Sequence, residues 1–400
     1  MADVRPFRAL RPRDDLARDV IAPPYDVLSE AEAREIARNR RSFVRVTRSE
    51  VDLPPGTDAH SDEAYRKARE NLDAFEAEGV MVLDDQPTFY LYGQKMGDHE
   101  QVGVLAGASV REYDEGLIAK HEHTRPDKED DRTHHMEVLD AQVGLVFLAY
   151  RNTPALANLI REGTSREPAW RVTTDDGVVH TLWVLPQELV EPMMEAFAEV
   201  PKLYVADGHH RSAAASRVHA RRRDEASAHF LAGLYPDDAL MVLAYNRLVR
   251  DLNGHDEASF LRAVGEVFTV TEGQPVPAER GHISMYLGGR WYDLEPKPSI
   301  RTDHPVRSLD VAMLQDHVLG PLLGIDDPRR SDRVQFVGGI RGPEALTRAV
   351  DAGEAAVAFH MFPTGLDQLF AVADAGEVMP PKSTWFEPKL REGVVVRKLS

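Results

Sequence analysis

The run Asp207-Gly208-His209-His210-Arg211 gathers groups suited to holding a phosphate. The apolar residues before it predict a strand over 203–206, and strong helix formers predict a helix over 212–223. Gly208 permits a tight turn, and the free amides and dipole of a helix start favour an anion. Arg211 adds a bidentate phosphate donor, while Asp207 can orient a histidine or hold a metal ion through water. The alternative is a solvated, Asp-capped helix, but two histidines and an arginine are unusual in a first turn that favours acidic residues.

A second cluster, His121-Glu122-His123-Thr124-Arg125, places a carboxylate between two histidines. Such a carboxylate can act as a general base or bind a metal ion. The spacing is not that of a zinc-protease helix, which needs both histidines on one helical face. His134 and His135 can widen the cluster into a metal site. We expect a functional role for Glu122 and a hydrophilic surface loop over 127–131.

A third candidate is Lys382-Ser383-Thr384, which follows two prolines. Prolines stiffen the approach, and a lysine with two hydroxyls suits a phosphate, although the glycines of a Walker loop are absent. Arg5, Tyr25 and Asp26 carry a weaker signal, because an N-terminal arm or an ordinary turn would look the same. Neither a GxGxxG nor a GxSxG motif occurs, which argues against a nicotinamide enzyme and a serine hydrolase.

The composition limits the classes of protein that fit. The 400 residues, 42% of them hydrophobic, provide for two or three domain-sized units. The absence of cysteine excludes disulfides, thiolate metal sites and a cysteine nucleophile, and it suits a reducing compartment. With 48 basic and 66 acidic residues the net charge is −18, which repels nucleic acid and anionic membranes. No bilayer-spanning run or signal peptide is apparent, so we expect a cytoplasmic location. The partner that we expect is a small-molecule substrate.

The elements predicted from hydrophobic periodicity are mixed throughout, which favours an α/β or α+β class. Ser29, with Glu32 placed for a capping box, begins the first predicted helix. The other predicted helices span 62–79, 186–199, 212–223, 257–268 and 308–319. The predicted strands span 42–48, 86–94, 102–110, 143–150, 178–185, 203–206, 240–248, 333–337 and 355–361, and Gly288-Gly289 turns a further hairpin of 283–287 and 291–294. We expect three parts: an N-terminal α/β subdomain over 1–110, a core over 111–250 and a C-terminal α/β subdomain over 251–400.

Several of these segments together resemble a known family. The segments are Arg5-Pro-Phe-Arg, Ala22-Pro-Pro-Tyr-Asp-Val, His121-Glu-His-Thr, Lys202-Leu-Tyr-Val-Ala-Asp-Gly-His-His-Arg and Met379-Pro-Pro-Lys-Ser-Thr. In this order, and over almost the whole chain, they resemble the bacterial family catalogued as domain of unknown function 1015. The Asp207–Arg211 run followed by alanines also resembles the nucleotide-binding box of the ParB and sulfiredoxin superfamily, which includes free-serine kinases.

This second resemblance implies a ParB/sulfiredoxin-like nucleotide-binding core with additional mixed-sheet subdomains. It implies phosphate contacts for Gly208, His209, His210 and Arg211, and a catalytic carboxylate at Glu122. The chain departs from the superfamily in length. Sulfiredoxin chemistry is excluded because its essential cysteine has no counterpart, and the net charge of −18 disfavours DNA clamping.

The main hypothesis is a small-molecule phosphotransferase acting on free serine or a similar hydroxylated metabolite, with a nucleotide or pyrophosphate donor and Mg²⁺. Glu122 would accept the hydroxyl proton, and Arg211 and His209 would stabilise the transferred group, assisted by His210 and Lys382. Arg5, Tyr25, Asp26, His121, His123 and Thr124 are the expected substrate contacts. The alternatives are a non-catalytic nucleotide-binding regulator and a metal-dependent hydrolase that uses the histidines of 121–135. Oligomeric state and strand order stay open.

Overall fold

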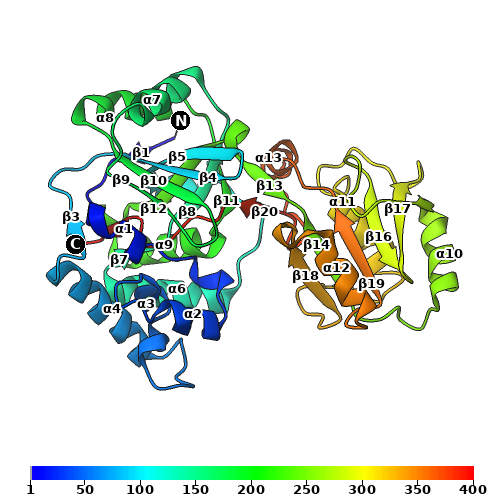
Figure 1. Ribbon diagram of the computed structural model, residues 1–400. Helices are drawn as coiled ribbons and strands as arrows, with labels where there is room; N and C mark the ends of the chain where they lie inside the picture. The colour runs from blue at the N-terminus through cyan, green and yellow to red at the C-terminus, as the bar shows by residue number, and fades with distance from the viewer. Residues whose placement is uncertain (1) are drawn as a thin grey trace. The chain divides into compact units, whose positions relative to one another are not determined.

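The computed structural model describes residues 2–400 and divides them into two compact units (Figure 1). The first unit runs to Leu240 and takes in Pro388–Ser400, and the second unit is Met241–Glu387. This division differs from the three predicted subdomains. Strands from both sides of the expected boundary at 110 lie in one sheet, and the last residues of the chain return to the first unit.

The first unit is built on a nine-stranded mixed sheet. Its strand order is β6-β11-β8-β12-β5-β4-β10-β9, with β1 also paired to β5. β6 runs parallel to β11, and β8 runs parallel to β12, whereas the other pairs are antiparallel. The strands are β1 (Val4–Arg5), β4 (Tyr90–Met96), β5 (His99–Ser109), β6 (Ile118–Ala119), β8 (Val146–Tyr150), β9 (Trp170–Thr173), β10 (Val179–Val184), β11 (Leu203–Asp207) and β12 (His229–Pro236).

A second, four-stranded sheet of this unit has the order β3-β2-β21-β7. It brings the last strand of the chain against one of the first, since Ala9 pairs with Arg397. Its strands are β2 (Ala9–Pro12), β3 (Met81–Leu83), β7 (Ala141–Gln142) and β21 (Val396–Lys398). The pairing holds the C-terminal segment against the N-terminal part of the chain.

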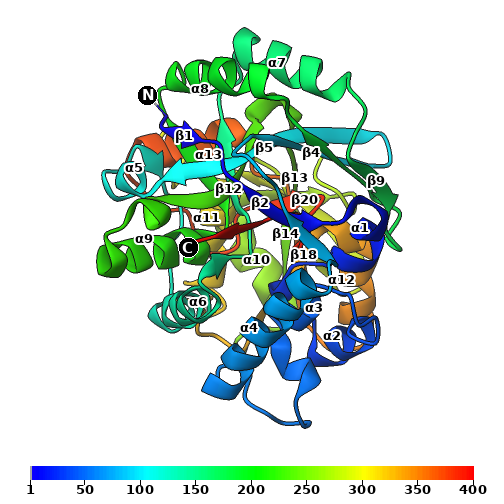
Figure 2. The same cartoon turned by 90° about the vertical axis from the view of Figure 1, so that its left-hand side faces the viewer.

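Helices cover both faces of the nine-stranded sheet. The helices of this unit are α1 (Ala17–Val20), α2 (Glu30–Ile36), α3 (Val44–Thr47), α4 (Asp62–Ala77), α5 (Val110–Asp114), α6 (Pro126–Leu139), α7 (Pro154–Thr164), α8 (Val190–Ala198) and α9 (His209–Arg222). Figures 1 and 2 show α7 and α8 on one face, and α9 on the other with α6 and α4 beyond it. Each layer buries the apolar side of a helix against a sheet or a neighbouring helix.

Two predictions about local structure are wrong. The predicted strand over 42–48 is helix α3, whose β-branched Val44, Val46 and Thr47 are buried in a helical turn. Their preference for strands is overridden by packing. The predicted surface loop over 127–131 lies in helix α6, which begins with Pro126 at its first position. The predicted capping box of Ser29 and Glu32 is confirmed at the start of α2.

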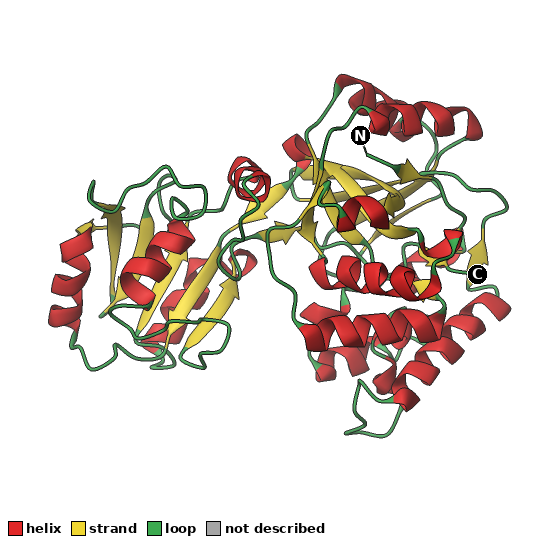
Figure 3. Cartoon of the chain, turned by 180° about the vertical axis from the view of Figure 1, so that it is seen from behind, coloured by secondary structure: helices red, strands yellow, loops and turns green. Residues whose placement is uncertain are grey.

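The second unit contains a six-stranded antiparallel sheet of order β15-β17-β16-β19-β14-β18, and β13 paired with β20. The predicted Gly288-Gly289 hairpin is confirmed, since Leu287 pairs with Arg290. Figure 3 shows its strands with helices beside them, so the mixed α/β class is confirmed in both units. The elements are β13 (Met241–Leu243), β14 (Tyr245–Val249), α10 (Glu257–Val267), β15 (Phe268–Glu272), β16 (Ile283–Leu287), β17 (Arg290–Pro296), α11 (Asp310–Leu314), β18 (Val334–Gly338), α12 (Gly342–Asp351), β19 (Val357–Met361), α13 (Leu366–Asp374) and β20 (Trp385–Glu387).

Within residues 2–400, no helix has both the length and the apolar character needed to cross a membrane.

Candidate active site

The Asp207–Arg211 run forms the expected strand–turn–helix junction. Strand β11 ends at Asp207, Gly208 is the N-cap residue, and α9 begins at His209, three residues earlier than predicted. The pairing of β11 with β8 shifts register between Val205 and Asp207, an irregularity of the kind that re-aims side chains beside active sites. Gly208 has φ 92°, a left-handed conformation that strains other residues. The run therefore lies where the free amides of a helix start point outward.

The Asp207 carboxylate is fixed at this junction by two donors. Its Oδ1 accepts a hydrogen bond from the Gly208 amide at 2.7 Å, and its Oδ2 lies 3.5 Å from Lys389 Nζ. Burial would raise the pKa of Asp207, but Lys389, Arg211 and His209 outweigh it and hold that pKa well below its usual range. The carboxylate is therefore ionised at neutral pH. Lys389 was missed by the sequence analysis, because a lone lysine far along the chain carries no motif.

Arg211 is partly buried. Its Nη1 donates a hydrogen bond to the Leu145 carbonyl at 2.5 Å. Among residues 2–400 no carboxylate lies within 4.0 Å of its guanidinium nitrogens. Burial works against the charge, but the nearby Asp207 and Asp26 raise the pKa of Arg211, so it stays a cation. A partly desolvated guanidinium without an ion-pair partner favours a bound anion.

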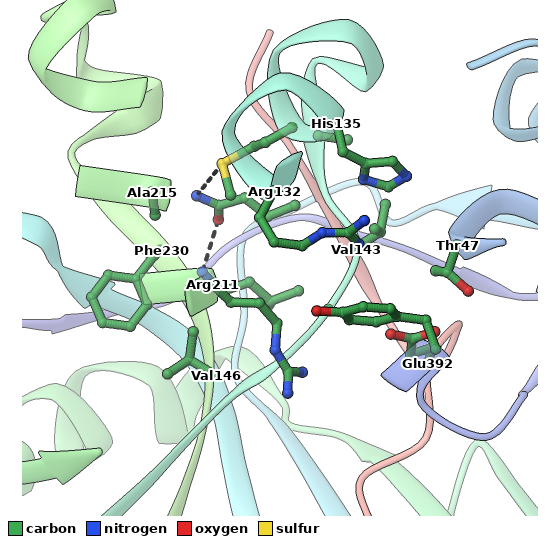
Figure 4. Close-up of a pocket in the computed structure, with 15 residues that line it drawn as sticks. Thr47, Arg132, His135, Val143, Val146, Arg211, Ala215, Phe230 and Glu392 are labelled. Atoms are coloured by element: carbon green, nitrogen blue, oxygen red, sulfur yellow. Dashed lines mark hydrogen bonds between the residues drawn. The ribbon is translucent and has the colours of Figure 1, made fainter. Parts of the chain in front are cut away.

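Arg211 lines a pocket that also receives Arg132 of α6, Tyr25 and Glu392 (Figure 4). Arg132 is paired with Asp131 at 2.7 Å, and its guanidinium lies 4.2 Å from the centre of the Tyr25 ring. Figure 4 shows that Arg132, Arg211 and Glu392 converge on one space from three segments of the chain. The predicted substrate residue Tyr25 is therefore brought to Arg211. Asp26, the residue after Tyr25, is exposed and is close enough to Arg211 to raise the pKa of Arg211.

Glu392 is a pocket residue that the sequence analysis missed. Its backbone pairs with Ala22, with amide-to-carbonyl distances of 3.0 and 2.9 Å, so the Ala22-Pro-Pro-Tyr-Asp segment and the C-terminal segment lie side by side. The residue is only 3% exposed, and its Oε2 has no hydrogen-bond partner in the described part of the chain. Burial raises the pKa of Glu392 to about 7, against the opposing effect of Arg211. The only local sequence signal near Glu392 is the glycine that follows it: Gly393 has a positive φ, as a specific turn requires.

The predicted His121–Glu122 cluster meets the start of α9 at His209. One ligand atom each of His121, Glu122 and His209 lie within 4.8 Å of one another. The two rings meet edge to face with centres 4.6 Å apart, and both are buried. Burial lowers the pKa of His121 to about 4 and that of His209 well below its usual value, so both rings are neutral at pH 7. Glu122 is not among the residues that line the pocket of Arg211, and it meets the start of α9 at His209.

The rest of the His121 loop is docked onto α9. His210 Nε2 accepts a hydrogen bond from the Arg125 amide at 3.3 Å, which ties the loop to the helix start. The Thr124 hydroxyl bonds to Glu129 of α6, and His123 is exposed. His210 therefore positions the loop that carries Glu122, besides any role toward a phosphate.

Other predicted residues lie elsewhere. Arg5 is paired with Asp3 at 2.7 Å on β1 and is not brought to the pocket. His134 contacts Asp62 and Tyr65, and His135, which lines the pocket, donates from Nε2 to the Val46 carbonyl, so neither joins His121. Lys382, Ser383 and Thr384 belong to the second unit, where the Ser383 hydroxyl donates to the Pro380 carbonyl at 2.6 Å. Their part in the site stays a prediction.

Comparisons with known proteins give one family. The family model described as "Protein of unknown function (DUF1015)" matches residues 4–312, and a search of curated proteins gave no match. Similar solved structures include SbnI with C-terminal truncation from Staphylococcus aureus, at TM-score 0.40 and 11% identity over 72% of this chain and 84% of that one. A free serine kinase in complex with AMP gives TM-score 0.35 and 12% identity over 71% and 86%. A conserved hypothetical protein from Pyrococcus furiosus gives 0.35 and 12% over 71% and 90%. At scores this low, the function has to be inferred from the side chains of the site.

Proposed function

The chain belongs to the DUF1015 family, and we propose that it is a small-molecule phosphotransferase that moves a phosphoryl group from a nucleotide or pyrophosphate to a hydroxylated metabolite such as free serine. In phosphoryl transfer the protein acts mainly by positioning the reactants and stabilising charge, and it does little covalent chemistry itself. It needs cationic and amide donors that hold the transferred group, and a base for the attacking hydroxyl.

The observation that carries the proposal is Arg211 at the α9 start. Its guanidinium is partly buried, has no ion-pair partner among the described residues, and shares a pocket with Arg132. Helix amides begin at the same point, behind Gly208. A dianionic phosphate satisfies both sets of donors, whereas a neutral ligand leaves the guanidinium charge unpaired.

Glu122 is the proposed base. It lies in the loop that His210 ties to the α9 start, within 4.8 Å of the nearest ligand atoms of His121 and His209. In the transfer, the acceptor oxygen bonds to the terminal phosphorus as the bond to the leaving phosphate breaks, and the hydroxyl proton passes to Glu122. Mg²⁺ accompanies the donor, and the Asp207 carboxylate, whose side chain is 38% exposed, would hold it through water. Mg²⁺ would neutralise charge on the leaving phosphate.

The test is a transfer screen of the purified protein, crossing ATP, ADP and pyrophosphate with a panel of hydroxylated metabolites that includes serine. Phosphorylated product from one pair, dependent on Mg²⁺, supports the proposal. Binding of a donor without transfer to any acceptor would favour the nucleotide-binding regulator instead.

A further inference from the structure

Two buried histidines meet at the α9 start, and each has a ring nitrogen without a hydrogen-bond partner in the described part of the chain. His121 is 3% exposed and His209 is 5% exposed, yet His121 Nδ1 and His209 Nε2 have no hydrogen-bond partner among residues 2–400. A buried polar atom without a partner costs free energy, so its retention calls for an explanation, such as an ion that it binds.

The topology explains why the two rings meet. Strands β6 and β11 run parallel, with Ile118 paired to Leu203 and Ala119 to Tyr204. His121 and His209 each follow the end of one of these strands by two residues, so both leave the same edge of the sheet. The rings then lie edge to face, with centres 4.6 Å apart.

We propose that His121, His209 and Glu122 form a binding site for a divalent first-row transition ion such as Zn²⁺ or Co²⁺. Their three ligand atoms lie within 4.8 Å of one another. Metal–ligand bonds of about 2.1 Å require separations no greater than about 4 Å, so the cluster closes only slightly on the ion. Two imidazoles with one carboxylate favour these ions, whereas Mg²⁺ prefers an all-oxygen set. Three protein ligands leave coordination positions open.

Such an ion would act on the same carboxylate that the proposed function uses as its base. A carboxylate bound to a divalent ion is a weaker proton acceptor, so Zn²⁺ should inhibit transfer even when Mg²⁺ is present in excess. This consequence rests on the proposed function. The binding of the ion does not, and it is measured without donor or acceptor.

The experiment titrates Co²⁺ into the metal-free full chain and follows the visible absorption of the bound ion, with Zn²⁺ as competitor in calorimetry. We expect one ion per chain, and binding weakened by on the order of a hundredfold or more in His121→Gln and in His209→Gln. His219→Gln is the matched control, because His219 lies on the same helix and bonds to Ser227 at 2.9 Å instead. It should bind as the parent does.

Circular dichroism of each variant shows whether it is folded. Because a buried histidine variant can fail to fold, Glu122→Gln provides a second test at a partly exposed position, and it should also weaken Co²⁺ binding. A parent protein that binds no Co²⁺, or folded histidine variants that bind it like the parent, would overturn the proposed site. If Co²⁺ binds as expected but no phosphate is transferred, the metal site stands and the phosphotransferase proposal fails.

Discussion

Glu392 should make the stability of the first unit depend on pH, and Glu392→Gln should remove that dependence. The carboxyl is 3% exposed and lies in a pocket with Arg211, Arg132, Tyr25 and the nearby Asp26. Burial raises its pKa from 4.5 to about 7 in the folded protein. Because the folded pKa is the higher one, the folded state binds the proton more tightly. The stabilisation is complete below pH 4.5 and is lost as pH rises through about 7.

The size of the effect can be worked out from the same values. A pKa that moves from 4.5 to about 7 corresponds to roughly 3 kcal/mol of unfolding free energy. Glutamine keeps the shape and never ionises, so Glu392→Gln should gain roughly 3 kcal/mol on the parent between pH 5 and pH 8. Urea unfolding followed by circular dichroism at four pH values measures the difference. Glu195→Gln, at an exposed position of the same unit, is the control and should shift stability equally at every pH.

An equal difference between Glu392→Gln and the parent at pH 5 and pH 8 would refute the argument. Glu392 would then be ionised throughout, and its charge would compete with a phosphate for Arg211. The ionisation of Glu392 should also affect how tightly the pocket binds the proposed phosphate donor. A bound phosphate disfavours the ionised form, so donor affinity of the parent should fall above pH 7, and in Glu392→Gln it should not.

Two further predictions concern Gly208 and His210 at the start of α9. Gly208→Ala places a Cβ at φ 92°, 3.1 Å from Arg211 Nε and 3.3 Å from Val146 Cα, so it should cost about 1–2 kcal/mol of stability and also weaken donor binding in calorimetry. Gly177→Ala has φ 81° with no atom within 4 Å, and it should lower the unfolding free energy without changing donor affinity; equal donor affinity in both variants would contradict the claim for Gly208. His210→Ala removes the acceptor of the Arg125 amide and should slow transfer and speed tryptic cleavage of the same loop after Lys120, with a stability loss of no more than about 1 kcal/mol. Unchanged transfer and cleavage would show that the loop does not depend on His210.

Local sequence signals predicted the parts of the site that lie within one segment. The apolar residues before Asp207, the glycine and the helix formers after it specify a strand–turn–helix unit, and the structure has it. Ser29 and Glu32 specify a capping box in the same way. The acidic run of 127–131 hid helix α6, because Asp131 is buried by pairing with Arg132 and Tyr65 rather than by apolar periodicity.

The contacts that join distant segments could not be predicted, because they depend on strand order. The meeting of His121 with His209 results from the parallel pairing of β6 and β11. Glu392 reaches the pocket because β21 pairs with β2 and the Glu392 backbone pairs with Ala22. Neither contact can be predicted from residue spacing within one segment of the sequence. Lys389 was missed for the same reason, because no local motif surrounds it.

The central claim is that Arg211 holds the phosphate donor while Glu122 only accepts a proton. Calorimetric titration of the parent, Arg211→Ala and Glu122→Gln with the best donor in Mg²⁺, beside the transfer rate of each, tests it most directly. Arg211→Ala should weaken donor binding by about tenfold to a hundredfold and slow transfer, since it removes a charged hydrogen-bond donor. Glu122→Gln should leave donor affinity nearly unchanged and lower turnover by on the order of a hundredfold or more. Turnover of Glu122→Gln at the parent's rate, or a parent that binds no donor, would contradict the account.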